Sequence, residues 1–170
     1  MEPKVFLAAG FGNYMTESGF IPERKQEILA YYNELHENGA LVFNSHVNEA
    51  WGNNGLPPEE CMRDDLRALL ASNCLCALVD NSGSNGVAFE LGYATSIRTP
   101  IVLVTQVFSD LSSMIRGIGE ILELRVVEGA LGDPAVIKRA CAEVIELATK
   151  RANSDRFWDN KDITRIFKFT

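Results

Sequence analysis

Short apolar runs alternate along the chain with longer segments in which apolar residues recur every three or four positions. Runs of this length that are apolar throughout are typical of strands buried on both faces of a sheet. The sequence therefore predicts five strands, which are "KVFLAA" (4–9), "ALVFNS" (40–45), "CLCALVD" (74–80), "PIVLVTQ" (100–106) and "ILELRVV" (121–127).

The segments between these runs have the spacing of amphipathic helices. Gly39 ends the first, and Asp133 followed by Pro134 begins the last, as expected for helix termini. Strands that alternate with helices imply parallel pairing with right-handed crossovers. We therefore expect an α/β fold, a flavodoxin-like, doubly wound, five-stranded parallel sheet with helices on both faces. The predicted helices are residues 22–38, 57–73, 87–99, a short one within 109–120, and 133–151.

The alternation continues to about residue 152 without a linker or an internal repeat. A chain of 170 residues suits one domain, so residues 1–152 are predicted to form a single catalytic α/β domain. Residues 153–170 form a polar tail with spaced aromatic residues. This tail is expected to dock on the domain or on a neighbouring subunit.

Composition and charge exclude several classes of function. The net charge is -7 and no basic cluster is present, which argues against a nucleic-acid partner. No apolar run reaches membrane-spanning length and none resembles a signal peptide, so we expect a cytoplasmic protein without a membrane partner. With four cysteines, no CxxC pair and two histidines, no metal site is predicted. Cys74 and Cys76 alternate within an apolar run and should lie on one face of a strand.

In doubly wound sheets, ligands bind beyond the carboxyl ends of the strands, near the point where strand order reverses. The loops after the first three strands should therefore build the site. These loops are "GFGN", "SHVNEAWG" and "NSGSNG", and Gly10 at the end of the first strand is a candidate for contact with substrate.

The third loop leads into a helix through Ser84, Asn85 and Gly86. A hydroxyl beside the free N–H groups of a helix start can hold an anion, although the same pattern also fits a simple N-cap. The spacing is not that of a P-loop, which disfavours a nucleoside triphosphate. Glu90 follows four residues after Gly86, among large apolar neighbours, and points either to water or into a cleft.

Four further residues allow a structural and a functional interpretation. Asp64 and Asp65 would ordinarily be a solvated pair of charges. His46 would ordinarily be a hydrogen-bonded structural residue rather than a catalyst. Trp51 could close the edge of the core or stack on a planar ring.

Five motifs follow one another along the chain, "VFLAAGF", "VFNSHVNEAWG", "DDLRALLASNCLCALVD", "SNGVAFELGYA" and "LSSMIRG". In this order they resemble the nucleoside 2-deoxyribosyltransferase superfamily, and within it the nucleoside 5′-monophosphate N-glycosidases. That branch includes CMP hydrolases and deoxynucleoside monophosphate N-hydrolases. The resemblance extends from about residue 5 to residue 117, with Gly12 where the CMP hydrolases carry an arginine.

The resemblance implies roles for individual residues. The nucleophilic glutamate falls on Glu90, and the aspartate that positions the sugar and assists proton transfer falls on Asp65. Ser84 corresponds to a phosphate-binding serine, and Ser112 to a second one that a neighbouring subunit donates. The resemblance also places Phe6, His46, Glu49 and Trp51 in the site, beside the loop candidates Gly10, Asn85 and Gly86.

The function implied is hydrolysis of the N-glycosidic bond of a pyrimidine ribonucleotide, CMP in the first instance, to free base and ribose 5-phosphate. Phe6 in place of a tyrosine leaves room for a ribose 2′-hydroxyl. No cofactor or metal is required, and Ser112 implies a homodimer. The alternatives are a transferase that exchanges bases on deoxyribonucleosides and a non-catalytic nucleotide-binding module.

Overall fold

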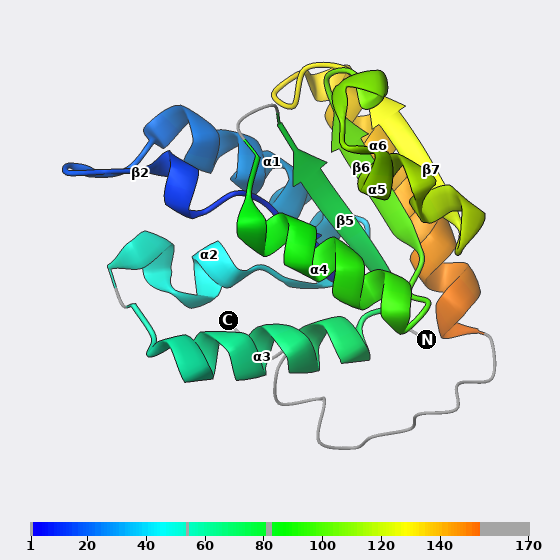
Figure 1. Ribbon diagram of the computed structural model, residues 1–170, viewed down its shortest axis with the longest axis horizontal. Helices are drawn as coiled ribbons and strands as arrows, with labels where there is room; N and C mark the ends of the chain where they lie inside the picture. The colour runs from blue at the N-terminus through cyan, green and yellow to red at the C-terminus, as the bar shows by residue number, and fades with distance from the viewer. Residues whose placement is uncertain (1, 54, 81–82, 154–170) are drawn as a thin grey trace.

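The computed structural model describes residues 2–53, 55–80 and 83–153, and its centre is a five-stranded parallel sheet (Figure 1). The strand order is β4-β1-β5-β6-β7, and every neighbouring pair is parallel. The predicted flavodoxin-like fold is therefore confirmed, and strand order reverses at β1, between β4 and β5. The strands are β1 (Lys4–Ala8), β4 (Leu41–Phe43), β5 (Cys74–Val79), β6 (Ile101–Thr105) and β7 (Leu124–Glu128).

Helices cover both faces of this sheet, as predicted. One face is buried by side chains of α1 (Pro22–Glu37) and α6 (Pro134–Ala152). The other face is buried by side chains of α3 (Pro58–Ala71) and α4 (Asn85–Ser96). Strand residues alternate between the two layers, because successive side chains of a strand point to opposite faces. Cys74 and Cys76 both lie in the α1/α6 layer, as their spacing predicted.

The loops after β1 and β4 contain more regular structure than the sequence indicated. The first holds a 3-10 turn, η1 (Gly12–Tyr14), and a hairpin of β2 (Met15–Thr16) and β3 (Gly19–Phe20). The second holds α2 (Ser45–Asn48) and a 3-10 turn, η2 (Ala50–Gly52). The predicted second strand ends early because the Asn44 side chain caps α2 and accepts a 3.1 Å hydrogen bond from the Val47 N–H.

The fifth strand also starts later than predicted. Before it come η3 (Phe108–Asp110), α5 (Ser113–Arg116) and η4 (Gly117–Glu120). The backbone N–H groups of Ile121 and Leu122 both donate to the Ile118 carbonyl, at 2.9 and 3.2 Å, so the chain is still turning there. An apolar run alone could not distinguish this turn from a strand.

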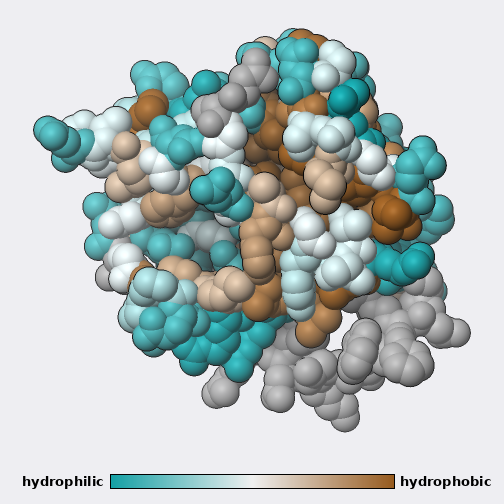
Figure 2. Space-filling view, viewed as in Figure 1, coloured by the Kyte–Doolittle hydropathy of each residue, from teal (hydrophilic) through white to brown (hydrophobic). Residues whose placement is uncertain are grey.

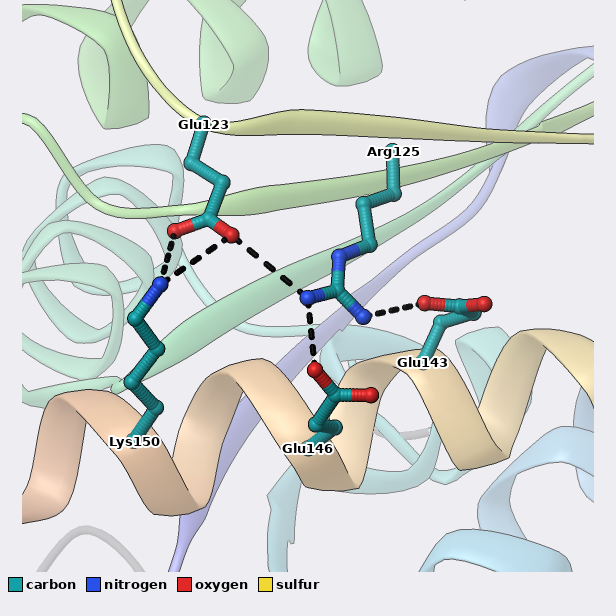
Figure 3. A network of polar contacts seen from close by, with 5 residues as sticks. All are labelled: Glu123, Arg125, Glu143, Glu146 and Lys150. Carbon is teal, nitrogen blue, oxygen red and sulfur yellow. Dashed lines mark hydrogen bonds and ion pairs between the residues drawn. The ribbon is translucent and has the colours of Figure 1, made fainter.

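A network of ion pairs ties α6 to the edge strand β7 (Figure 3). Arg125 on β7 binds Glu143 and Glu146 of α6, with 2.8 Å between its Nη2 and Glu146 Oε1. Glu123 bridges Arg125 and Lys150, whose Nζ lies 3.1 Å from Glu123 Oε2. Exposed pairs of this kind contribute about 0–1 kcal/mol each. The network lies toward the start of β7, away from the carboxyl ends of the strands, so we interpret it as structural.

Nearly all of the predicted docking tail, residues 154–170, lies outside the described residues. Within the part that the structure describes, no helix is both long enough and apolar enough to cross a membrane.

Candidate active site

Two cavities meet at Ser84, beyond the carboxyl ends of β1 and β5. We call the larger, of 430 Å³, the serine cavity, and the smaller, of 130 Å³, the carboxylate cavity. The polar wall of the serine cavity includes Asp80, Ser84, Asn85, Asp110 and Ser112, with Gly10 beside them. The wall of the carboxylate cavity includes Phe11, His46, Glu49, Asp65, Gly86 and Glu90. The three sequence-predicted loops therefore come together.

Ser84 stands at the start of α4 and in the wall of both cavities. Its Oγ accepts a long 3.4 Å hydrogen bond from the Val87 N–H, so the residue is an N-cap. A helix start presents N–H donors and the positive end of the helix dipole. The N-cap and anion-cradle interpretations are thus compatible, because the cap sits in a cavity wall.

Ser112 lines the serine cavity in the same chain as Ser84. It caps the short helix α5, and its Oγ accepts a 3.4 Å hydrogen bond from the Ile115 N–H. One chain therefore brings both predicted serines to one cavity. The donation of Ser112 to a neighbouring subunit's site stays a prediction.

Glu90 lies on α4 in the wall of the carboxylate cavity. Its Oε2 is inaccessible to solvent and has no hydrogen-bond partner among the described residues. Burial, with a smaller contribution from the charge of Asp65, raises the pKa of Glu90 to about 8. Burial thus outweighs the helix dipole, which would favour the ionised carboxylate.

Asp65 comes from α3 and faces the same cavity, unlike an ordinary solvated aspartate. Its Oδ1 accepts a 2.8 Å hydrogen bond from Ser45 Oγ. Burial raises the pKa of Asp65 to about 6, and the Ser45 hydrogen bond opposes this shift. The pKa of Glu90 is the higher of the two, so at neutral pH the free pair holds its proton mainly on Glu90 and its charge mainly on Asp65.

Glu49 is the third carboxyl group of the carboxylate cavity. Burial raises its pKa, and a hydrogen bond with the Cys61 thiol acts in the opposite direction. The cavity therefore concentrates protonatable oxygens. In the described part of the chain, no three Asp, Glu, His or Cys side chains are arranged to hold a metal ion.

His46 is buried and holds two loops together. Its Nε2 lies 2.9 Å from the Gly10 carbonyl oxygen, to which it donates, and its Nδ1 accepts from Asn44 Nδ2 at 3.3 Å. Burial lowers the pKa of His46 to about 4, which keeps the ring neutral at physiological pH. The structural interpretation of this histidine is supported, although the ring also forms part of the cavity wall.

Three aromatic residues differ from expectation in their positions. Phe6 is fully buried in the core, with its ring 5.2 Å from that of Phe43, and does not line the carboxylate cavity. Trp51 packs behind His46, with 5.6 Å between ring centroids, and lines neither cavity. Phe11, which the sequence analysis missed, lines the carboxylate cavity and stacks on His46 at 4.9 Å. Its place directly after Gly10, in a loop that was predicted to build the site, is the sequence feature that could have identified it.

The sequence model of the nucleoside 2-deoxyribosyltransferase family matches residues 14–128, more than half of the chain. The chain belongs to this family. The match includes Asp65, Ser84, Glu90 and Ser112.

Three solved structures share the fold of this nucleoside 2-deoxyribosyltransferase family member. BlsM, determined in solution, is 25% identical, with a TM-score of 0.71 over 92% of this chain and 97% of BlsM. Clostridium botulinum CMP N-glycosidase, BcmB, is 21% identical, with a TM-score of 0.62 over 85% and 99%. The 2-deoxyribosyltransferase of Bacillus psychrosaccharolyticus is 18% identical, with a TM-score of 0.57 over 79% and 95%. No curated protein sequence matches the chain.

Replacement of Glu90, whose carboxyl group is buried, by glutamine is expected to stabilise the fold by an amount that depends on pH. The pKa of Glu90 rises from 4.5 to about 8 on folding, so between these values the unfolded state loses a proton that the folded state keeps. As the pH rises to about 8, this difference in bound protons progressively lowers the free energy of unfolding. Above that pH the loss of stability stays constant. Glu90→Gln removes it, and the free energy of unfolding should rise by on the order of 2 kcal/mol or more at pH 8.5.

Denaturant unfolding at pH 4.5 and pH 8.5 measures this gain. The exposed Glu120 lies outside both cavities, and Glu120→Gln serves as the control that should show no comparable rise. An equal effect of Glu90→Gln at the two pH values would contradict the burial of an ionisable Glu90.

Proposed function

We propose that the protein is a nucleoside 5′-monophosphate N-glycosidase that hydrolyses a pyrimidine nucleotide, CMP in the first instance, to free base and sugar phosphate. The observation that carries this proposal is the meeting of the two cavities at Ser84. One side offers buried carboxyl groups, and the other offers a helix start with serine hydroxyls. A nucleotide has the matching ends, with a reactive anomeric carbon and an anionic phosphate.

Glu90 is proposed as the nucleophile. Departure of the base leaves positive charge on the sugar, and a carboxylate beneath the anomeric carbon stabilises that charge and forms a glycosyl ester. Water then breaks the ester and releases the sugar phosphate. Glu90 is partly exposed in the wall of the carboxylate cavity, and its Oε2 has no hydrogen-bond partner among the described residues.

Asp65 is proposed as the proton donor to the leaving base. The raised pKa values of Asp65 and Glu90 mean that the pair holds one proton between them at neutral pH. Because the pKa of Glu90 is the higher of the two, Glu90 holds most of this proton in the free protein, and reaction requires the minor form, with the proton on Asp65 and the charge on Glu90. A single shared proton thus supplies both an acid and a nucleophile.

The base is proposed to lie in the carboxylate cavity. At 130 Å³ this cavity is small, which favours a pyrimidine over the larger purine. Phe11 supplies an aromatic face in its wall, and Glu49 a hydrogen-bonding carboxyl group. The CMP N-glycosidase fold shared with this chain agrees with a pyrimidine substrate.

The sequence-based argument for ribose over deoxyribose is not supported by the position of Phe6. That argument placed Phe6 next to the sugar, whereas Phe6 lies in the core against Phe43. A side chain with no exposed surface cannot sense a 2′-hydroxyl. The substrate screen must therefore include both sugars.

The activity is tested by incubating the protein with CMP, UMP, AMP, GMP and their deoxy forms, and separating the products by chromatography. Release of cytosine and ribose 5-phosphate from CMP is expected. A second free base added to the reaction detects base exchange, because a new nucleoside or nucleotide would identify a transferase. Binding without turnover of any nucleotide would leave a non-catalytic module.

We also propose a homodimer that covers an apolar groove between α4 and α5. The groove adjoins the serine cavity, and Ser112 lines both. Met114 and Ile121 in its wall are 84% and 55% exposed, and Figure 2 shows hydrophobic surface in this region. A second copy seated there would approach Ser112. Patches of this kind on soluble proteins commonly mark interfaces.

Met114→Asp is expected to convert a dimer into a monomer, because it introduces a charge at the centre of the proposed contact. Light scattering on the full chain measures the mass of both proteins. Met62→Asp is the matched control, since Met62 is also exposed but lies outside the groove. A monomeric wild-type protein that still cleaves nucleotides would contradict the dimer.

A further inference from the structure

Asp80 is a charged residue of the serine cavity that the proposed reaction does not use. It directly follows β5, and its backbone carbonyl accepts a 3.4 Å hydrogen bond from the Gly83 N–H. The buried Tyr14 donates a hydrogen bond from its Oη to Asp80 Oδ2, and Asn13 Nδ2 donates to the Gly83 carbonyl. The position of the Asp80 carboxylate is therefore held by the loop after β1.

The charges around the serine cavity are unusual for a site that accepts an anion. Asp80 and Asp110 both line it, and among its described lining residues there is no Lys or Arg. The Arg24 guanidinium lies 5.3 Å from the Tyr14 ring centroid, is paired with Glu27 at 2.7 Å, and also interacts electrostatically with Asp80 from outside the cavity wall. Attraction for an anion therefore comes from hydroxyls and the start of α4, and the carboxylates oppose it.

The size of the cavity does not explain a limit on the substrate. Its 430 Å³ falls in the range of about 300–1,000 Å³ that is typical of whole small-molecule sites. Space alone would admit more than one phosphate group. Any discrimination between a monophosphate and a longer phosphate chain in this cavity would therefore have to depend on charge.

We propose that Asp80 is a specificity-determining residue that limits the negative charge a substrate can carry at its phosphate end. The Tyr14 hydroxyl shields this carboxylate enough for one phosphate to bind. The inference rests on the proposed function, because it assigns the serine cavity to the phosphate. Repulsion grows with each added charge, so a triphosphate is penalised more than a monophosphate, and a nucleoside is not penalised.

Asp80→Asn tests the charge directly, because asparagine can still accept the Tyr14 hydrogen bond through its Oδ1. Binding of cytidine, CMP and CTP is measured by calorimetry in a Glu90→Gln background, which prevents turnover. We expect the substitution to tighten CMP binding by about tenfold and CTP binding by more, with cytidine changed by less than about twofold. Glu120→Gln, which removes an exposed charge outside the cavity, should change none of the three.

Tyr14→Phe tests the shield, because it removes the hydroxyl and keeps the ring. CMP binding should weaken severalfold while cytidine binding stays the same, and adding Asp80→Asn to Tyr14→Phe should restore CMP binding. A purely structural link between the loops predicts instead that both variants weaken cytidine and CMP equally. That result would overturn the proposal, as would an unchanged ratio of CTP to CMP affinity in Asp80→Asn.

The same measurements separate this inference from the proposed function. Wild-type cleavage of CMP together with an unchanged affinity ratio removes only the role of Asp80. Absence of both CMP binding and CMP cleavage removes the proposed function, and the role of Asp80 with it.

Discussion

Replacement of Glu90 by glutamine is expected to lower kcat for CMP hydrolysis by at least about 10³-fold, because an amide can neither attack the anomeric carbon nor carry the charge that stabilises the sugar cation. Binding of CMP should change much less, since Ser84 and Phe11 remain in place on either side of the substitution. Glutamate and glutamine side chains have nearly the same shape, so the substitution leaves the space in the cavity unchanged. The loss should therefore appear in kcat rather than in KM.

Single-turnover measurement of cytosine release, with calorimetry for CMP affinity, gives both quantities. Glu120→Gln makes the same chemical change on an exposed helical turn and should leave kcat unaltered. Turnover by Glu90→Gln within about tenfold of the wild type would exclude Glu90 as the nucleophile.

Replacement of Asp65 by asparagine is expected to lower kcat for CMP by about 10²-fold and to change the shape of the pH profile. The wild-type profile of kcat/KM should be bell-shaped. Below about pH 6 both carboxyl groups of the Asp65–Glu90 pair are protonated and the nucleophile is lost, and above about pH 8 both are ionised and the acid is lost. Asp65→Asn removes the acid, so the alkaline limb should disappear.

The acidic limb of Asp65→Asn should then report the ionisation of Glu90 alone, with a midpoint below about pH 8. The charge of Asp65 is one cause of the raised pKa of Glu90, so its removal lets Glu90 ionise more readily. Rates measured from pH 5 to pH 9.5 on both proteins provide the comparison. An analogue whose leaving group needs no protonation should be cleaved by Asp65→Asn at nearly the wild-type rate. A bell that persists in the variant would assign the alkaline limb to another group.

The fold was predictable because its signals are local. Each strand is a short apolar run, each helix has a repeating stripe, and Ser84 and Asp133 are recognisable N-caps. The parallel order then follows from general rules of chain connection. The misplaced boundaries, at Asn44 and Ile121, are positions where a side-chain cap or a turn ends an apolar run.

The sequence by itself determined the sheet and the loops that line the two cavities, since spacing and side-chain type are written along the chain, and the roles of individual residues followed from the family resemblance. Only the tertiary structure decided which of them meet. It placed Phe6 in the core and Phe11 in the cavity wall, and it brought Asp80 within reach of Tyr14. It also placed Asp65 beside Glu90, and the burial that raises their pKa values depends on residues distant in sequence. Proximity and desolvation are properties of the folded chain, and no local pattern records them.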